Sequence, residues 1–154
     1  MQEFPHHYDV TAAAGVDGDV ELIARDLPTL RSASPAEFDG PGNRWSPESF
    51  LVAAVGDCFI LTFRAVARAS KLPWTALHCD MTGTLDRVDR VTKFTGFEIQ
   101  AHLDVPPGTD VAQARRVLEK AEQNCLITNS LTGTIRLIPE IEVAPQAVGE
   151  LVEA

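Results

Sequence analysis

Residues 46–63 read SPESFLVAAVGDCFILTF, and this stretch indicates the central element of the fold. Ser46 can cap a helix, Pro47 suits its first position, and Glu48 suits the positive end of the helix dipole. The residues that follow are apolar almost all round a helix, which is typical of a helix inside a core or between subunits. We therefore expect a buried helix over residues 47–67.

The apolar part of this stretch is short for a membrane span. It runs from Phe50 to Phe63, about fourteen residues, and contains Asp57, whereas a spanning helix needs roughly 20 residues. The helix becomes polar at Arg64 and Arg68 and is expected to end near residues 70–73. The sequence therefore predicts a core helix and no association with a membrane.

Strand patterns lie on both sides of this helix, and a second helix follows them. The expected elements are alternating residues over 20–24, a loop over 31–46 rich in Ser, Pro and Gly, strands over 77–85 and 97–105 with a polar connection at 86–90, an amphipathic helix over 111–125 capped by Thr109 or Asp110, and a strand over 135–143. This order predicts an α+β fold with a largely antiparallel sheet and two principal helices.

The size and charge of the chain narrow the classes of function. Its 154 residues suffice for one domain, which we expect to span residues 1–154. The net charge of −9 disfavours nucleic acid and anionic membranes as partners. Residues 1–7 lack the basic and apolar segments of a secretory signal, and the cysteine count is odd. We therefore expect a protein of the reducing cytoplasm.

Three cysteines are the candidate reactive groups. Cys79 falls on the apolar side of a strand pattern and is expected to be an inert buried thiol. Cys58 lies in the middle of the apolar helix, and Cys125 lies where the amphipathic helix ends. Their spacing alone demands no pair. If two cysteines from different helices face one pocket, one thiolate can attack a peroxide and the other thiol can resolve the resulting sulfenic acid.

Patterns for other chemistries are missing from the sequence. His6 and His7 are adjacent, but there is no Cys-x-x-Cys or His-x-x-x-His spacing for a metal. Glycine-rich phosphate loops and Ser-His-Asp motifs are also absent. We therefore expect no metal and no bound cofactor.

Two motifs resemble those of the OsmC/Ohr family, the osmotically induced protein C and organic hydroperoxide resistance proteins. The first is Pro-Glu, then an Ala-rich apolar run, then a Cys ten residues after the Glu, as in Glu48 and Cys58. The second is a helix that ends in Cys before a turn with Ser or Thr, as in residues 121–131, AEQNCLITNSL. The order of the expected elements also matches, so the resemblance covers nearly the whole chain.

The resemblance implies both a fold and a reaction. The fold would be an intertwined α+β homodimer with two central helices and active sites at the subunit interface. Cys58 would be the peroxidatic thiol, Cys125 the resolving thiol, and Glu48 a member of the polar network around them. The implied activity is thiol-dependent reduction of organic hydroperoxides to alcohols, an antioxidant function in oxidative stress that uses no metal, haem or flavin. A cellular dithiol would regenerate the cysteine pair.

Two residues depart from the family pattern. Leu126 follows the second cysteine, where many peroxidase members have Pro. Glu37 stands where we align the arginine that helps to hold the reactive thiolate, and an acid there disfavours a thiolate. The cations that could substitute for that arginine are Arg25, Arg31 and Arg44.

These departures leave two alternatives to the peroxidase. One is a protein of the same fold without peroxidase activity, which binds a small apolar or thiol-reactive ligand at the dimer interface. The other is a structural or interaction protein with inert cysteines, which a bulky maleimide would not label in the folded dimer.

Overall fold

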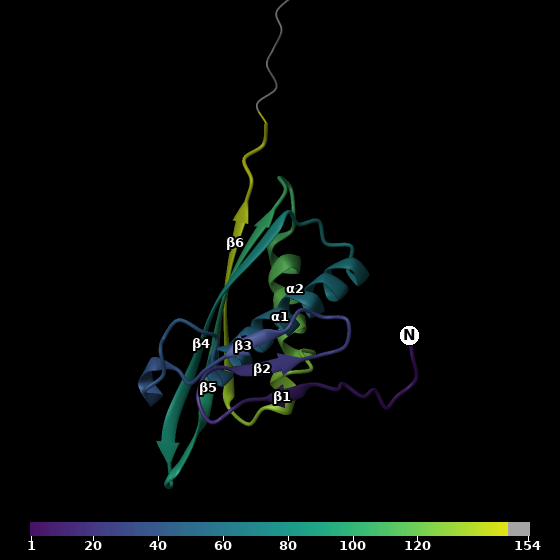
Figure 1. Ribbon diagram of the computed structural model, residues 1–154. Coiled ribbons are helices and arrows are strands. Elements are labelled where there is room, and N and C mark those ends of the chain that lie inside the picture. Colours follow the sequence, from purple (N-terminus) through teal and green to yellow (C-terminus); the bar gives the residue numbers. More distant parts are fainter. Residues whose placement is uncertain (148–154) are drawn as a thin grey trace, which may run out of the picture. The chain divides into compact units, whose positions relative to one another are not determined.

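The computed structural model describes residues 1–147 and has the α+β organisation that the sequence predicts (Figure 1). The elements are β1 (Thr11–Ala13), β2 (Val20–Ile23), β3 (Leu30–Ser32), η1 (Ala36–Phe38), α1 (Pro47–Ala69), β4 (Ala76–Val88), β5 (Val91–Val105), α2 (Val111–Gln123), η2 (Thr128–Ser130) and β6 (Thr134–Val143). Met1–Leu51 form one compact unit, and a second begins at Val52. A single domain over 1–154 stays a prediction.

The first unit contains a small antiparallel sheet and the start of α1. β2 is the central strand and pairs with both β1 and β3. Ser46 caps α1 as predicted: its Oγ accepts the Ser49 amide at 3.2 Å, and the Ser46 amide donates to Ser49 Oγ at 2.8 Å. This reciprocal pair is a capping box in which Ser replaces the usual Glu, and it fixes where the helix begins.

Helix α1 ends at Ala69, beside residues 70–73 where the sequence predicts its end, in a turn that closes on itself. Lys71 has a φ of 51°, a left-handed conformation that usually belongs to Gly at this position. Its amide donates to the Arg68 carbonyl at 3.2 Å, and the Leu72 amide donates to the Ala67 carbonyl at 3.0 Å. These two bonds form a Schellman motif, which satisfies carbonyls that the helix end would otherwise leave unpaired.

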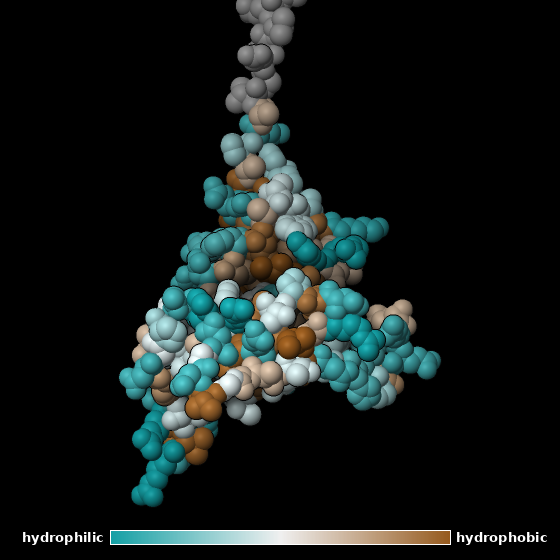
Figure 2. Space-filling view, viewed as in Figure 1, coloured by the Kyte–Doolittle hydropathy of each residue, from teal (hydrophilic) through white to brown (hydrophobic). Residues whose placement is uncertain are grey.

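The second unit is built on one sheet in the order β4–β5–β6. β4 and β5 are antiparallel, and their last paired residues, Val88 and Val91, leave a two-residue turn. Asp89 and Arg90 in that turn both have positive φ, as tight hairpin turns require. The strands therefore extend into the segment 86–90, which the sequence predicted as connection. In the space-filling view the tip of this hairpin, lowest in the picture, is hydrophilic (Figure 2).

Strand β6 lies beside β5 and runs parallel to it. A parallel neighbour needs a crossover connection, and α2 supplies it. The sheet is therefore mixed, with its longest pairing antiparallel, which confirms a largely antiparallel sheet. Pro139 has no amide to donate, and β6 at the sheet edge accommodates it.

The core of the second unit lies between one face of this sheet and the helices. In Figure 1, α2 and the part of α1 after Val52 lie on the same side of the sheet. The alternation predicted over 97–105 is confirmed, because the inward side chains of β5 are buried. The buried core residues here include Phe97, Ile99, Ala101, Leu103 and Val105 of β5, Phe59 and Phe63 of α1, and Leu118 and Ala121 of α2.

Gly83 lies where strand β4 approaches helix α1 closely. A Cβ there would lie 2.6 Å from Val52 Cγ2 and 2.9 Å from the Phe94 ring. We expect Gly83→Ala to lower the free energy of unfolding by about 1–3 kcal/mol, since a packed core yields little to an added methyl group. Urea denaturation measures this. The control is Thr82→Ala on the exposed side of β4, and an equal loss in both variants would contradict the packing argument.

Helix α1 exposes apolar surface in a single chain. By length and composition alone it could cross a membrane, a test that core helices of soluble proteins also pass. Only 33% of its most apolar 18-residue window is buried, and Leu61 is 53% exposed. The predicted burial of this helix is therefore incomplete within one chain.

Candidate functional site

Cys58 lies in the middle of α1, with its side chain partly exposed. Thr62 follows it by one helical turn, and the Cys58 Sγ lies 3.9 Å from the Thr62 Oγ1. Residues four apart on a helix share a face, so the hydroxyl is held beside the thiol by the helix itself. The local sequence therefore gives Cys58 one polar neighbour in an otherwise apolar helix.

Cys125 is fully buried just after α2. Its amide closes the end of α2 on the Glu122 carbonyl, and its own carbonyl accepts the Asn129 amide at 3.0 Å. The Thr128 hydroxyl donates to the same carbonyl at 3.2 Å. Cys125 thus joins the end of α2 to the start of the η2 turn.

The turn after Cys125 presents amides that the backbone does not use. Within residues 1–147, the amides of Leu126 and Ile127 donate to no backbone carbonyl. Such unpaired amides are ordinary at the beginning of a helical turn, and they attract negative charge. They are therefore free to interact with a side chain of another element.

The second unit brings Cys58 and Cys125 close enough for each thiol to affect the pKa of the other. Burial by itself raises the pKa of the Cys58 thiol, but four donors oppose it, and the net pKa lies below the ordinary value. The donors, in order of effect, are the Ile127 amide, the Cys125 thiol, the Thr62 hydroxyl and the Leu126 amide. Cys58 is thus the thiol more easily ionised.

Cys125 is shifted in the opposite direction. Burial raises the pKa of the Cys125 thiol, and the nearby Cys58 raises it further, while the hydroxyl and amide of Thr128 lower it only in part. A proton shared between the two sulfurs therefore stays on Cys125. This asymmetry suits a pair in which Cys58 is the nucleophile and Cys125 is a donor in the resting state.

Cys79 is the third thiol and lies half-buried on β4. Burial, followed by the negative charge of Asp80, raises the pKa of Cys79 to about 11. A thiol with this pKa is almost fully protonated at neutral pH and is a poor nucleophile. The inert role expected from the sequence agrees with this environment.

Glu48 begins α1 and belongs to the first unit. Its Oε2 is buried and has no hydrogen-bond partner within residues 1–147. A buried carboxylate oxygen without a donor is costly, so this atom is one that a further donor would stabilise. Its predicted catalytic role stays a prediction.

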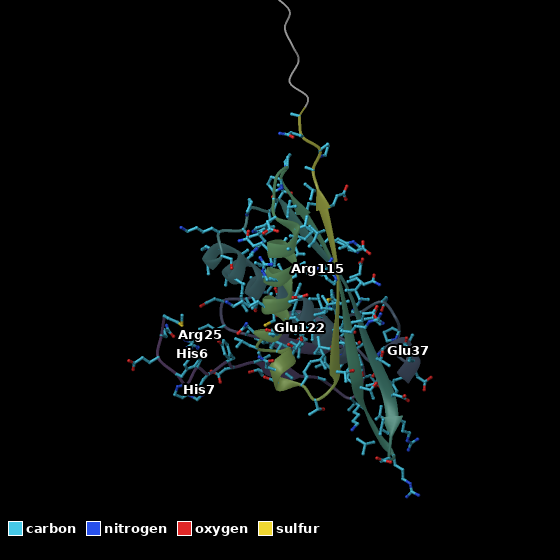
Figure 3. The ribbon with its side chains drawn as sticks, turned by 180° about the vertical axis from the view of Figure 1, so that it is seen from behind. His6, His7, Arg25, Glu37, Arg115 and Glu122 are labelled. Atoms are coloured by element: carbon cyan, nitrogen blue, oxygen red, sulfur yellow. The ribbon has the colours of Figure 1, made fainter. Side chains whose placement is uncertain are left out.

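Two of the three arginines that could replace the family's thiolate-holding arginine already have carboxylate partners. Arg44 Nε donates to Asp19 at 2.9 Å, and Arg31 lies 3.8 Å from Glu21. Figure 3 shows Arg25 and, on the η1 turn, Glu37, both exposed. All the groups that lower the pKa of Cys58 are uncharged. These uncharged groups therefore lower the pKa of the Cys58 thiol without a cation.

Sequence reasoning missed the donors around Cys58. Thr62 could have been found from its spacing of four residues from Cys58. The sequence shows that Leu126 replaces the Pro of many family members. The consequence that was missed is that Leu has a backbone amide to donate to Cys58, whereas Pro has none. The amide of Ile127 has no sequence signal of its own.

The described part of the chain shows no arrangement for a metal. Within residues 1–147, no group of three or more His, Cys, Asp or Glu side chains is placed to hold one. His6 and His7 lie on the exposed N-terminal segment, where Figure 3 labels them.

Comparisons with known proteins identify relatives of the chain and its fold. A family model described as "OsmC-like protein" matches residues 40–140. The uncharacterized protein YmaD of Bacillus subtilis is 29% identical over 153 residues, which are 94% of this chain and 98% of YmaD. An organic hydroperoxide resistance protein of Xanthomonas axonopodis pv. citri is 28% identical over 128 residues, 81% of this chain and 86% of that protein. The structure of an OsmC-like protein of unknown function from Vibrio cholerae covers 90% of this chain and 100% of its own, with a TM-score of 0.79 at 15% identity.

Proposed function

The chain belongs to the OsmC-like protein family and has its α+β fold, and from this premise we propose that it is a cysteine-based peroxidase that reduces organic hydroperoxides to alcohols. A distant relative is named as an organic hydroperoxide resistance protein. The observation that carries the proposal is the pairing of Cys58 and Cys125 from two helices, with the pKa of the first lowered and that of the second raised.

In the first step, the Cys58 thiolate attacks one oxygen of the hydroperoxide O–O bond. A sulfur–oxygen bond forms, the O–O bond breaks, and the alkoxide takes up a proton and leaves as the alcohol. Cys58 is then a sulfenic acid, oxidised by two electrons. The amides of Leu126 and Ile127 stabilise the negative charge on Cys58 before the attack.

In the second step, Cys125 attacks the Cys58 sulfur and a disulfide forms. The sulfenic oxygen leaves as water, with one proton from Cys125. The two thiols have then supplied the two electrons that reduce the peroxide. A cellular dithiol reduces the disulfide by exchange, which returns both thiols. We propose the reducing cytoplasm as the compartment, because dithiol reductants are maintained there.

The direct test is turnover of cumene hydroperoxide with dihydrolipoamide as the dithiol. The reduced protein should consume the peroxide catalytically and form cumyl alcohol in equal amount. The side chains that surround Cys58 on α1 are mostly apolar and favour a bulky organic peroxide over hydrogen peroxide. The rate with hydrogen peroxide should therefore be lower. Absence of turnover with any organic hydroperoxide would reject the proposal.

A second candidate function rests on the uncharged surroundings of Cys58. The groups that lower its pKa include no cation, and Glu37 stands where the family arginine is expected. The alternative is a protein of this fold without peroxidase activity, which binds a small apolar or thiol-reactive ligand. Such a protein would leave Cys58 and Cys125 reduced after exposure to cumene hydroperoxide.

We also propose that the protein works as a homodimer. The exposed apolar surface of α1, including Leu61, is what a second copy would cover. The expected result is a mass in solution of twice the 16.7 kDa chain, measured by light scattering after size-exclusion chromatography. A single chain mass at micromolar concentration would contradict this proposal.

The Leu126 amide offers a test of how Cys58 is activated without a cation. Leu126→Pro removes one donor to the thiolate, so the pKa of Cys58 should rise and the pH midpoint of its alkylation should move upward. The rate with cumene hydroperoxide at neutral pH should fall by roughly tenfold or more, the effect of one hydrogen bond to a charged group.

The matched control is Leu126→Ala, which keeps the amide. The Leu126 side chain is 74% exposed, so its truncation removes little packing. An unchanged pH midpoint in Leu126→Pro, or an equal shift in Leu126→Ala, would show that this amide does not stabilise the thiolate.

A further inference from the structure

The connection between α1 and β4 forms a pocket that the thiol chemistry does not use. Its volume is about 590 Å³. Neither Cys58 nor Cys125 lines it. The lining residues are Arg64, Ala67, Arg68, Lys71, Leu72, Pro73 and Trp74. Three of the seven are cationic and none is acidic, in a chain whose net charge is −9.

The three cations have no carboxylate partner within residues 1–147. None of the ion pairs in this part of the chain includes Arg64, Arg68 or Lys71. Arg44, by contrast, is held by an aspartate at 2.9 Å. Cations gathered around one pocket repel one another, and an anion bound between them would relieve that repulsion.

The end of α1 accounts for Arg68 at most, the one of these cations that lies in its last turn. Lys and Arg near a helix end often pair with its last carbonyls. Here backbone amides already bond the carbonyls of Val66, Ala67 and Arg68, and the Gln113 side chain donates to the Ser70 carbonyl at 2.9 Å. Arg64 also lies more than one turn before the end of the helix, beyond the reach of its dipole.

Lys71 adds a second observation at the same pocket. Its φ of 51° is one that Gly adopts without strain and that a side chain makes unfavourable. A lysine therefore stands where glycine would be more stable. A residue kept in an unfavourable conformation at a pocket points to a use for its side chain.

The floor of the pocket is apolar. Ala67 and Leu72 are buried, and the Trp74 ring packs edge-on against Phe63 with centroids 5.2 Å apart. The site thus combines three cationic groups with an aliphatic and aromatic surface. Ligand sites commonly pair such a surface with a few polar groups that fix the orientation.

We propose that this pocket binds a small organic anion, with its carboxylate or phosphate group among Arg64, Arg68 and Lys71 and its apolar part against Leu72 and Trp74. The site is separate from the two thiols, so it is independent of the peroxidase proposal. A carboxylate and a phosphate share the chemistry that the cations recognise. Comparison of the two probes identifies which is preferred.

The test follows the indole N–H signal of Trp74 by NMR, assigned with Trp45→Phe, while octanoate or octyl phosphate is added. We expect a saturable shift at millimolar concentration that weakens as sodium chloride is raised. The tighter of the two probes identifies the anionic group. Octanol is the neutral control and should not produce the shift. No saturable shift with either anion, or an equal shift with octanol, would overturn the proposal.

Two variants separate binding from folding. Arg64→Gln should weaken octanoate binding about tenfold, the effect of losing one charge-assisted hydrogen bond. Lys71→Gly should weaken it similarly while raising the melting temperature by roughly 2–4 °C, because it removes the strained side chain. The control for the loss of one positive charge is Lys93→Gln on β5, which should change neither. Unchanged affinity in both pocket variants would contradict the proposal.

Discussion

Cys58→Ser should abolish the reduction of cumene hydroperoxide, with a fall of at least about 10³-fold in the rate. A serine hydroxyl stays protonated at neutral pH, and the donors around residue 58 do not bring it near ionisation. The variant loses the attack on the peroxide, and no other cysteine can replace Cys58, because no other thiol in the described chain has a lowered pKa. The measurement is peroxide consumption in the presence of dihydrolipoamide.

The matched control is Cys79→Ser. Cys79 has a raised pKa of about 11 and lies on β4, so its removal should leave the rate within about twofold. A melting curve of each variant separates lost chemistry from lost folding. Substantial turnover by a folded Cys58→Ser protein would place the nucleophile elsewhere.

Cys125→Ser should uncouple the two steps. The first attack by Cys58 needs no disulfide, and the serine hydroxyl can still donate to the Cys58 sulfur, so one equivalent of alcohol should still form at close to the native rate. Steady turnover should fall by roughly 10–100-fold, since an external thiol must replace a partner already in place. Cys58 should accumulate as a sulfenic acid.

Trapping with dimedone and mass spectrometry would identify that intermediate. With excess peroxide, Cys58 in this variant should proceed to the sulfinic acid, while the native protein is protected by its disulfide. An equal steady rate in Cys125→Ser and the native protein would show that Cys125 is not the resolving thiol. The rate of the first turnover provides the internal control, because it depends on Cys58 alone.

The parts of the fold that depend on neighbouring residues could be predicted from the sequence. The Ser46 cap fixes the start of α1, and the Asp110 side chain accepts two amides at the start of α2. The alternation over 97–105 matches the buried face of β5. Each of these signals depends on contacts along one element or on a single buried face.

The structure differs from the sequence prediction in two respects, the pairing of strands far apart in the sequence and the local backbone conformation of a turn. Nothing in residues 134–143 indicates that β6 runs parallel to β5, because direction is set by the α2 crossover. The polar segment 86–90 predicts a connection, but the strands pair as far as Val88 and Val91 and leave only Asp89 and Arg90 in the turn. Whether such a polar segment forms strand or turn depends on the hydrogen bonds between the two strands rather than on its composition.

In the candidate site, too, the sequence predicts which residues take part but not how the fold brings them together. The identity of Cys58 and Cys125 came from motifs, but their spacing of 67 residues says nothing of their proximity. That proximity arises because α1 and α2 pack on one side of the same sheet. The amides of Leu126 and Ile127 carry no side-chain signal, so only the turn geometry after α2 shows them to be donors.

The central claim is that Cys58 and Cys125 form a two-cysteine redox cycle, and peptide mass spectrometry tests it most directly. The reduced protein is treated with one equivalent of cumene hydroperoxide and digested without reductant. We predict that each chain loses the mass of two hydrogens, with Cys58 and Cys125 in one disulfide-linked peptide pair and Cys79 still a free thiol. Unchanged thiols, or oxidation scattered over all three cysteines, would contradict the account.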